Sequence, residues 1–202
     1  MRKLMLLVAV LFACRTADAQ SLSDLLRLFG IGSSASREET VQTSGPSLTA
    51  EKLCGTWTYA EPVVVYEGGD VLGAIGVKAL EGSMPSMYAK AGLSAGKGSV
   101  TFTGKGEASA RLGDHKVTGT YSFAASDGSL TLSAKVGDAS GVLHGSASTD
   151  EDGVLTLVFD ASEAAAIIEQ ASAKAASNDN FRMMKALLNS CPGVMMGAKF
   201  RR

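Results

Sequence analysis

Apolar residues recur at every second position in a series of short segments between residues 97 and 160. The clearest segments are Val100–Thr103, Lys116–Phe123, Ser129–Ser133 and Val154–Phe159. This period is typical of a β-strand with one buried face and one solvent-exposed face. Asp127-Gly128 and Asp152-Gly153 lie between such segments, and both pairs favour tight hairpin turns because they tolerate positive φ. The pattern therefore predicts an antiparallel meander.

Eight candidate strands result when this pattern is followed along the chain. They span residues 55–66, 99–103, 107–112, 116–123, 129–136, 141–148, 153–159 and 194–200. Eight strands suit a small closed barrel, which leaves no free sheet edges and holds side chains or one small ligand inside. Pro62 predicts a bulge or an edge position in the first strand. The predicted fold class is mainly β (α+β), an eight-stranded antiparallel barrel with helical insertions.

Two helical insertions interrupt the strands. The first, residues 70–93, follows the first strand, and we expect Gly82 and Pro85 to divide it into two short helices. The second precedes the last strand and opens with Asp160 and Glu163 in the spacing of a capping box. Apolar residues on both insertions recur three and four apart, which indicates surfaces that face a core or plug a barrel. Along the second insertion these residues are Ala164, Ile167, Ile168, Ala171 and Ala175, then Phe181, Met184, Leu187 and Leu188 after a cap at Asn178.

The first 19 residues have the pattern of a signal peptide. Arg2 and Lys3 are followed by a run of ten apolar residues and by the small-residue cleavage site Ala17-Asp18-Ala19. The apolar run is shorter than the about 20 residues that a membrane-spanning helix requires, so no transmembrane span is expected in the mature chain. Alternatively, Leu11–Cys14 approximates a bacterial lipobox, in which Cys14 would carry lipid. The sequence thus predicts a periplasmic or secreted protein, with an outer-membrane lipoprotein as the alternative.

The rest of the chain divides into a tether and one domain. Residues 20–48 are rich in Gly, Ser and charged residues, and such a composition buries too little apolar surface to offset the cost of ordering the backbone. We therefore predict a flexible tether there. Thr49 is placed to cap a short helix at the start of the domain, which spans residues 49–202.

Charge and cysteine content narrow the possible partners. Removal of residues 1–19 leaves 16 basic and 19 acidic residues, a net charge of −3, which argues against a nucleic-acid partner. Cys54 and Cys191 then remain, and two cysteines in an exported chain favour one disulfide. In the chain-entropy model that bond would stabilise the fold by about 3–5 kcal/mol. The alternative is two separately buried thiols.

The sequence shows no convincing catalytic or metal-binding constellation. Its two histidines, His115 and His144, follow a turn and lie in an alternating segment, respectively. A zinc site would need three or four convergent ligands, and no Gly-x-Ser-x-Gly motif is present to mark a hydrolase nucleophile. We therefore predict neither an enzyme nor a metal or cofactor site.

Four aromatic residues are the candidate ligand-binding residues. Trp57 and Tyr59 alternate on the first strand, and Tyr121 and Phe123 alternate on the fourth, so each pair faces one side of its strand. Such residues line a cavity or simply fill a core. Small strand residues leave space inside the barrel for a ligand or an inserted helix; they are Ala108, Ala110, Ala134, Ala139 and Ala147.

The start of the first strand carries a family resemblance. Leu53–Tyr59 places Gly-x-Trp after a short helical turn, which is similar to the lipocalin start, where the Trp closes the barrel floor. The chain resembles more closely a family of exported, lipocalin-like proteins of unknown function from Gram-negative bacteria. The matching segments are Gly55–Trp57, Glu61–Tyr66, Tyr88–Leu93, Gly119–Tyr121, Leu155–Asp160 and Gly193–Phe200. The resemblance covers about residues 48–202 and implies a calyx with helices at its mouth or floor, but no activity.

Two functional hypotheses follow. The first is an exported, non-catalytic binding protein that holds a small apolar or amphipathic ligand in the barrel. The alternative is a cell-envelope interaction module whose barrel is plugged by its own helices and whose partner is an envelope protein. The sequence gives no indication of the oligomeric state.

Overall fold

The computed structural model describes residues 48–68, 71–90, 93–112, 115–136, 139–171, 177 and 179–202. Within this part, eight antiparallel strands form a closed barrel in sequence order, with β8 paired to β1, which confirms the predicted fold class. The strands are β1 (Gly55–Tyr66), β2 (Gly98–Phe102), β3 (Glu107–Leu112), β4 (His115–Ala124), β5 (Ser129–Val136), β6 (Ala139–Thr149), β7 (Leu155–Asp160) and β8 (Val194–Arg201). The predicted signal peptide and all but the last residue of the predicted tether lie outside the described residues.

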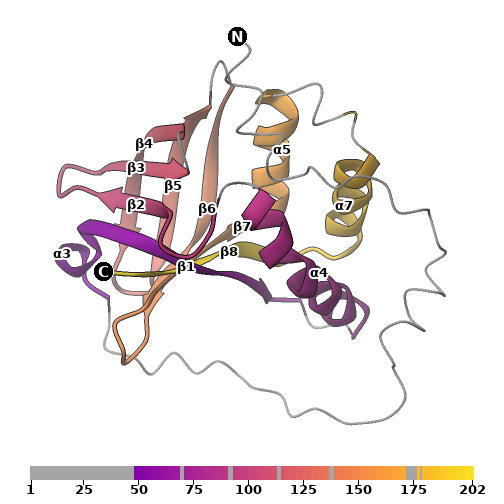
Figure 1. The fold of residues 1–202 in the computed structure, drawn as a ribbon, viewed down its shortest axis with the longest axis horizontal. Coiled ribbons are helices and arrows are strands. Elements are labelled where there is room, and N and C mark those ends of the chain that lie inside the picture. The colour runs from indigo at the N-terminus through magenta and orange to yellow at the C-terminus, as the bar shows by residue number, and fades with distance from the viewer. Residues whose placement is uncertain are drawn as a thin grey trace.

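The helices gather mainly at one end of the barrel. They are α3 (Ala50–Leu53), α4 (Val71–Lys90), α5 (Ala161–Ala171) and α7 (Asp179–Ser190). Figure 1 shows α3 beside the C-terminus at one end, called the floor below, and α4, α5 and α7 at the opposite, helical end. Both insertions are therefore where the sequence placed them, after the first strand and before the last.

The predicted hairpin turns are present. Gly128 and Gly153 have φ values of 75° and 74°, which a residue with a side chain rarely adopts. The Asp127 carboxylate accepts a hydrogen bond from the Ser129 N–H at 2.9 Å, and this bond lowers the pKa of Asp127. These local bonds fix the short connections that the meander requires.

A core cluster fills the floor of the barrel. Trp57 is 3% exposed, and its Nε1–H donates to the Leu53 carbonyl oxygen at 2.8 Å. The Arg202 guanidinium carbon lies 4.6 Å from the Trp57 ring centroid. The same guanidinium donates to the carbonyl oxygens of Lys52 and Cys54, so the last residue holds α3 against the first strand. The buried members of the cluster are Leu48, Leu53, Trp57, Phe102, Ala108, Leu130, Ala147, Leu155 and Leu157.

The barrel opens toward its helical end because β1 changes neighbours along its length. Gly55–Thr58 pairs with β2, whereas Thr58–Tyr66 pairs with β8, and the register shifts between Tyr59 and Glu61. Pro62 lies in the part that pairs with β8 alone, which confirms the edge position, one of the two alternatives predicted for it; the register shift precedes it. Beyond Tyr59, α4 takes the place of a second neighbouring strand along β1.

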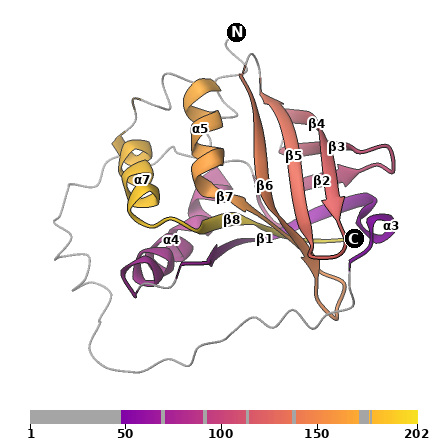
Figure 2. The ribbon, with the colours of Figure 1, turned by 180° about the vertical axis from the view of Figure 1, so that it is seen from behind.

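A similar opening separates β6 from β7, which pair only from Gly145 to Thr149. Helix α5 packs along the remaining part of β6 (Figure 2). The Glu163 carboxylate accepts hydrogen bonds from the His144 N–H at 2.6 Å and shares one with His144 Nδ1 at 2.7 Å. Helix α5 thus provides a hydrogen-bond acceptor for a part of β6 that does not pair with β7.

The helix caps at Thr49 and Asp160 follow the sequence with one difference, and the cap predicted at Asn178 lies outside the described residues. The Thr49 hydroxyl caps α3 by accepting from the Lys52 N–H at 3.3 Å. The Asp160 carboxylate caps α5 by accepting from Ser162 N–H at 2.7 Å and Glu163 N–H at 3.0 Å. Glu163, expected to complete a capping box, instead bonds to β6, because that strand edge lies within reach of its carboxylate.

The first insertion forms one helix rather than the predicted two. Helix α4 is continuous over 20 residues and contains Pro85. Pro85 is solvent-exposed, so its ring displaces no core side chain. Met84 and Tyr88, which are buried against the barrel, anchor the helix on both sides of the proline. Packing of this face offsets the cost of the missing backbone N–H.

The structure contradicts the predicted disulfide, because Cys54 and Cys191 both carry free thiols. Cys54 precedes β1, whereas Cys191 precedes β8, whose first residue pairs with Tyr66 at the far end of β1. The length of β1 separates them, roughly 40 Å at about 3.3 Å per residue, whereas a disulfide requires Cα atoms within about 7 Å. The cysteine count predicted a bond, but it carries no information on which end of a strand each residue occupies.

Candidate functional site

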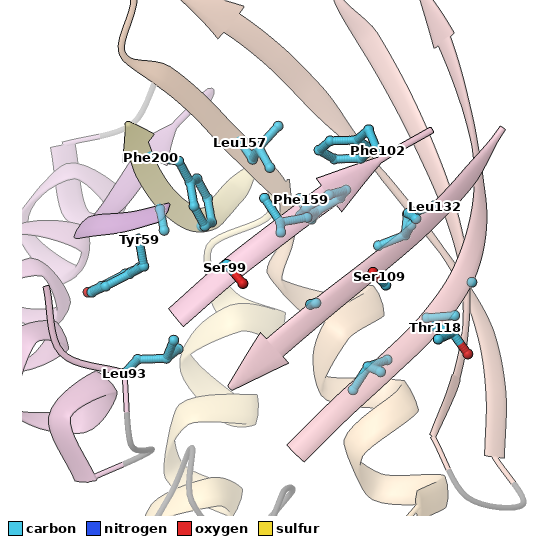
Figure 3. A pocket seen from close by; sticks show the side chains of 18 of the residues that line it. Tyr59, Leu93, Ser99, Phe102, Ser109, Thr118, Leu132, Leu157, Phe159 and Phe200 are labelled. Atoms are coloured by element: carbon cyan, nitrogen blue, oxygen red, sulfur yellow. The ribbon is translucent and has the colours of Figure 1, made fainter. Parts of the chain in front are cut away.

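A cavity of 210 Å³ lies inside the barrel, above the floor cluster. Figure 3 shows the strands that surround it and the side chains that line it. In a barrel of eight strands, side chains of ordinary size would fill the interior. Here many of the inward positions carry small residues, which leave the space open. They are Ala108, Ala110, Ala134 and Ala198, with Gly119 and Gly197. Larger apolar side chains close the remaining sides, namely Val117, Leu132, Leu157, Phe159 and Phe200.

Close strand packing explains the glycines in this wall. A Cβ atom at Gly197 would lie 1.8 Å from the Leu157 carbonyl oxygen, and one at Gly119 would lie 2.2 Å from the Ser133 carbonyl oxygen. Any side chain at these positions would force neighbouring strands apart. The curvature of the barrel therefore selects glycine here, and the glycines in turn add to the space inside.

The four aromatic residues predicted from the sequence divide between two places. Tyr59 lines the cavity. Trp57, Tyr121 and Phe123 belong to the floor cluster below it and are not among the lining residues. The Tyr121 hydroxyl donates to the Thr103 carbonyl oxygen at 2.9 Å. Burial, together with the adjacent Cys54 thiol at 3.7 Å, raises the pKa of Tyr121 to about 12.

Tyr88 on α4 is a cavity residue that sequence reasoning missed. Its ring stacks on Tyr59 with centroids 5.9 Å apart, and its hydroxyl donates to the Gly197 carbonyl oxygen at 3.0 Å. Burial raises the pKa of Tyr88, and burial together with the nearby Glu61 carboxylate raises that of Tyr59 to about 12. Both phenols are therefore neutral near pH 7. The apolar spacing of α4 marked Tyr88 as buried, but only its packing on β1 and β8 brings it to the cavity.

The other side chains of the insertions cover the helical end without filling the cavity. Phe181, Met184 and Leu188 on α7 pack with Val194 and Met196 of β8 in a second core cluster. Among the described residues, the two insertions contribute only Tyr88 and Leu93 to the cavity lining, and Leu93 follows the end of α4. The cavity thus persists although the helices cover that end of the barrel.

The comparisons with known proteins agree with this architecture. Residues 30–202 match the lipocalin-like domain (DUF4923) family. The chain belongs to this family. No curated protein and no solved structure matches the chain. For this lipocalin-like domain, family membership establishes the kind of barrel, and the identity of any ligand has to be argued from the cavity itself.

Two further features bear on the chemistry of this lipocalin-like domain. In the described part of the chain, no three His, Cys, Asp or Glu residues converge in a way that could hold a metal ion. His144 and Glu163 lie on the outside of β6 and α5, with the histidine side chain 64% exposed, and the side chain of His115 lies outside the described set. Among the same described residues, no helix combines the length and hydropathy that crossing a bilayer demands.

Proposed function

We propose that this lipocalin-like domain is a non-catalytic binding protein that holds a small apolar or amphipathic molecule in its barrel. The observation that carries the proposal is the 210 Å³ cavity enclosed mainly by Ala, Gly and apolar side chains. A cavity of about 150 Å³ with apolar walls stays dry and binds benzene. By that scale, the barrel holds on the order of ten non-hydrogen atoms.

The few polar groups around the cavity would orient the ligand. An apolar pocket with a small number of fixed polar groups is the usual form of a small-molecule site. Here Tyr59 stands at the side of the cavity that faces α4, and its neutral hydroxyl can donate or accept a hydrogen bond. The apolar part of the ligand would lie deeper, among Leu132, Leu157 and Phe159.

The sequence pattern of residues 1–19 supports action outside the cytoplasm, in the periplasm or beyond, with lipidation at Cys14 as the alternative. The covered helical end gives some support to the second hypothesis, an interaction module for an envelope protein. We favour ligand binding because the helices leave the cavity unfilled, whereas the second hypothesis requires a barrel that its own helices plug.

Binding can be tested with 1-aminonaphthalene, a small fluorescent apolar probe that is neutral near pH 7. We expect saturable fluorescence enhancement with the wild-type protein. The double variant A110L/A134L adds methyl and methylene groups to two positions that line the cavity and should weaken binding at least about tenfold. The matched control is Ser133→Leu, which places the same side chain on the solvent-exposed face of β5 beside Ala134.

Thermal unfolding of each variant establishes that it remains folded. A wild-type protein that fails to bind the probe, or a filled variant that binds as well as Ser133→Leu, would refute the proposed function. Native mass spectrometry of protein isolated from its host would then identify the co-purifying molecule in the wild type, and the same measurement on the filled variant should show its loss.

A further inference from the structure

A second hollow lies outside the barrel wall, between β1 and α4. This groove has a volume of 480 Å³ and is lined by Tyr59–Val64, by α4 and by the turn after that helix. It exists because β2 pairs only with the first part of β1. Among the described residues, the last backbone hydrogen bond across this side of β1 runs from the Gly96 N–H to the Tyr59 carbonyl oxygen, at 2.9 Å. Beyond it, helix and strand stand apart and leave the groove.

The groove and the barrel cavity share two lining residues, Tyr59 and Leu93. These side chains therefore form the partition between the two spaces. Figure 3 shows both on the same side of the cavity, with the Tyr59 ring extending toward α4. Leu93 packs closely over Gly98, where a Cβ atom would lie 2.4 Å from its Cδ2. A ligand that moved these two side chains would connect the cavity with the groove.

The Tyr59 hydroxyl is a hydrogen-bonding group that a ligand at this partition could use. The residue is 4% exposed, yet its hydroxyl has no hydrogen-bond partner among the residues that the structure describes. The described side chains contain no fully enclosed polar atom without a partner, so this hydroxyl is not sealed off from solvent or a ligand. The stacked Tyr88 differs, because its hydroxyl is already bonded to Gly197. The Tyr59 hydroxyl is therefore an accessible donor and acceptor at the end of an otherwise buried side chain, and a ligand at the partition could bond to it.

Charge along the groove indicates the chemistry of the ligand's polar end. Of the described residues that line the groove, only Glu61 and Glu81 carry charge, and both are carboxylates. Glu61 accepts a hydrogen bond from Lys199 Nζ at 2.9 Å. Glu81 is exposed on α4, and no ion pair involves it within the described part of the chain. The groove thus favours a cationic group and disfavours an anionic one.

We propose that the ligand of the barrel is a single-chain amphiphile with a cationic head. Its alkyl end occupies the cavity, its chain passes between Tyr59 and Leu93, and its head lies in the groove near the Tyr59 hydroxyl and Glu81. This inference rests on the proposed function and extends it. It explains why a cavity that accommodates only on the order of ten atoms adjoins a larger, acidic space across a partition of two side chains.

The test compares decylamine, decanol and decanoate as competitors of 1-aminonaphthalene at pH 7 and low salt. We expect decylamine to bind more tightly than decanol and at least about tenfold more tightly than decanoate, because the head groups differ in charge while the chains are identical. Glu81→Gln should weaken decylamine binding by roughly two- to fivefold and leave decanol binding unchanged. The matched control is Glu151→Gln, an exposed carboxylate in the turn between β6 and β7, which should alter neither.

Tyr59→Phe provides a second, independent readout. It should weaken both decylamine and decanol by roughly three- to tenfold, because both head groups lose the same hydrogen-bond partner, and the affinity of 1-aminonaphthalene is measured separately for this variant. Equal affinity for decanoate and decylamine, or an unchanged decylamine affinity in Glu81→Gln, would overturn the cationic-head inference and leave the binding function in place. Failure of 1-aminonaphthalene itself to bind the wild-type protein would overturn both proposals.

Discussion

Replacing Arg202 with Ala removes the group that joins the last residue of the chain to the barrel floor. Arg202 lies over the Trp57 ring and donates to two carbonyl oxygens, those of Lys52 and Cys54. A cation–π contact at an exposed site contributes about 0.5–1 kcal/mol, and a net hydrogen bond about 0.5–1.5 kcal/mol. Because the guanidinium is exposed and partly screened by solvent, the sum is discounted, and we expect the variant to lower the free energy of unfolding by about 1–3 kcal/mol.

Denaturant-induced unfolding measures this change directly, and the chain contains a single tryptophan, so Trp57 fluorescence reports on the floor itself. The matched control is Arg201→Ala, since Arg201 is also exposed and its side chain makes no contact with Trp57 within the described structure. That substitution should change the free energy of unfolding by less than about 0.5 kcal/mol. Arg202→Lys should give an intermediate loss, because a lysine keeps the charge but lacks the planar group that stacks and bonds at two sites. Equal effects of Arg202→Ala and Arg201→Ala would show that the floor contact does not stabilise the barrel.

Three further predictions follow from individual contacts. Cys54 and Cys191 should each react with a thiol reagent in the denatured, unreduced protein, as mass spectrometry would show; recovery of a bond between them would contradict the strand register. Asp160→Ala should lower the free energy of unfolding by about 1 kcal/mol because it removes the cap of α5, whereas Ser162→Ala in the same turn should have little effect in the same denaturant titration. The free energy of unfolding should fall as the pH rises from about 10 to about 12. An unfolded tyrosine ionises near pH 10, whereas Tyr59 in the fold has a pKa of about 12. A raised pKa favours folding only while the phenol is protonated, so this contribution is lost across that range. Unfolding followed across that pH range should show a shallower decline for Tyr59→Phe, and an identical decline would disprove the assignment.

The strands were predicted to within about two residues because their information is local. Alternation along β4 and β5 indicates strands, and Asp-Gly pairs indicate hairpin turns, whatever barrel or sheet these segments form. Antiparallel neighbours joined by short turns then follow in order along the chain. Closure between β1 and β8 was inferred from strand number and from the family resemblance, and the register of Thr58–Tyr66 on β8 bears it out.

The candidate site was predicted only in part. Tyr59 alternates with Trp57 on the same face of β1, so the sequence treated the two as equivalent. The structure separates them, because Trp57 lies at the floor and Tyr59 lies one alternation further along, where the cavity begins. Periodicity identifies the face on which a residue lies, but it does not give the depth of that residue along the barrel axis.

The sequence by itself therefore determined the strands, the turns and the order of the insertions, since each depends on patterns that span a few residues, and the number of strands favoured a barrel. Only the tertiary structure decided that Cys54 and Cys191 lie at opposite ends of β1, that Pro85 is contained in one helix, and that Tyr88 stacks on Tyr59 beside an open cavity. These outcomes depend on where β1 exchanges β2 for α4 as its neighbour, a choice set by the packing of segments far apart in the chain. No local pattern encodes such packing.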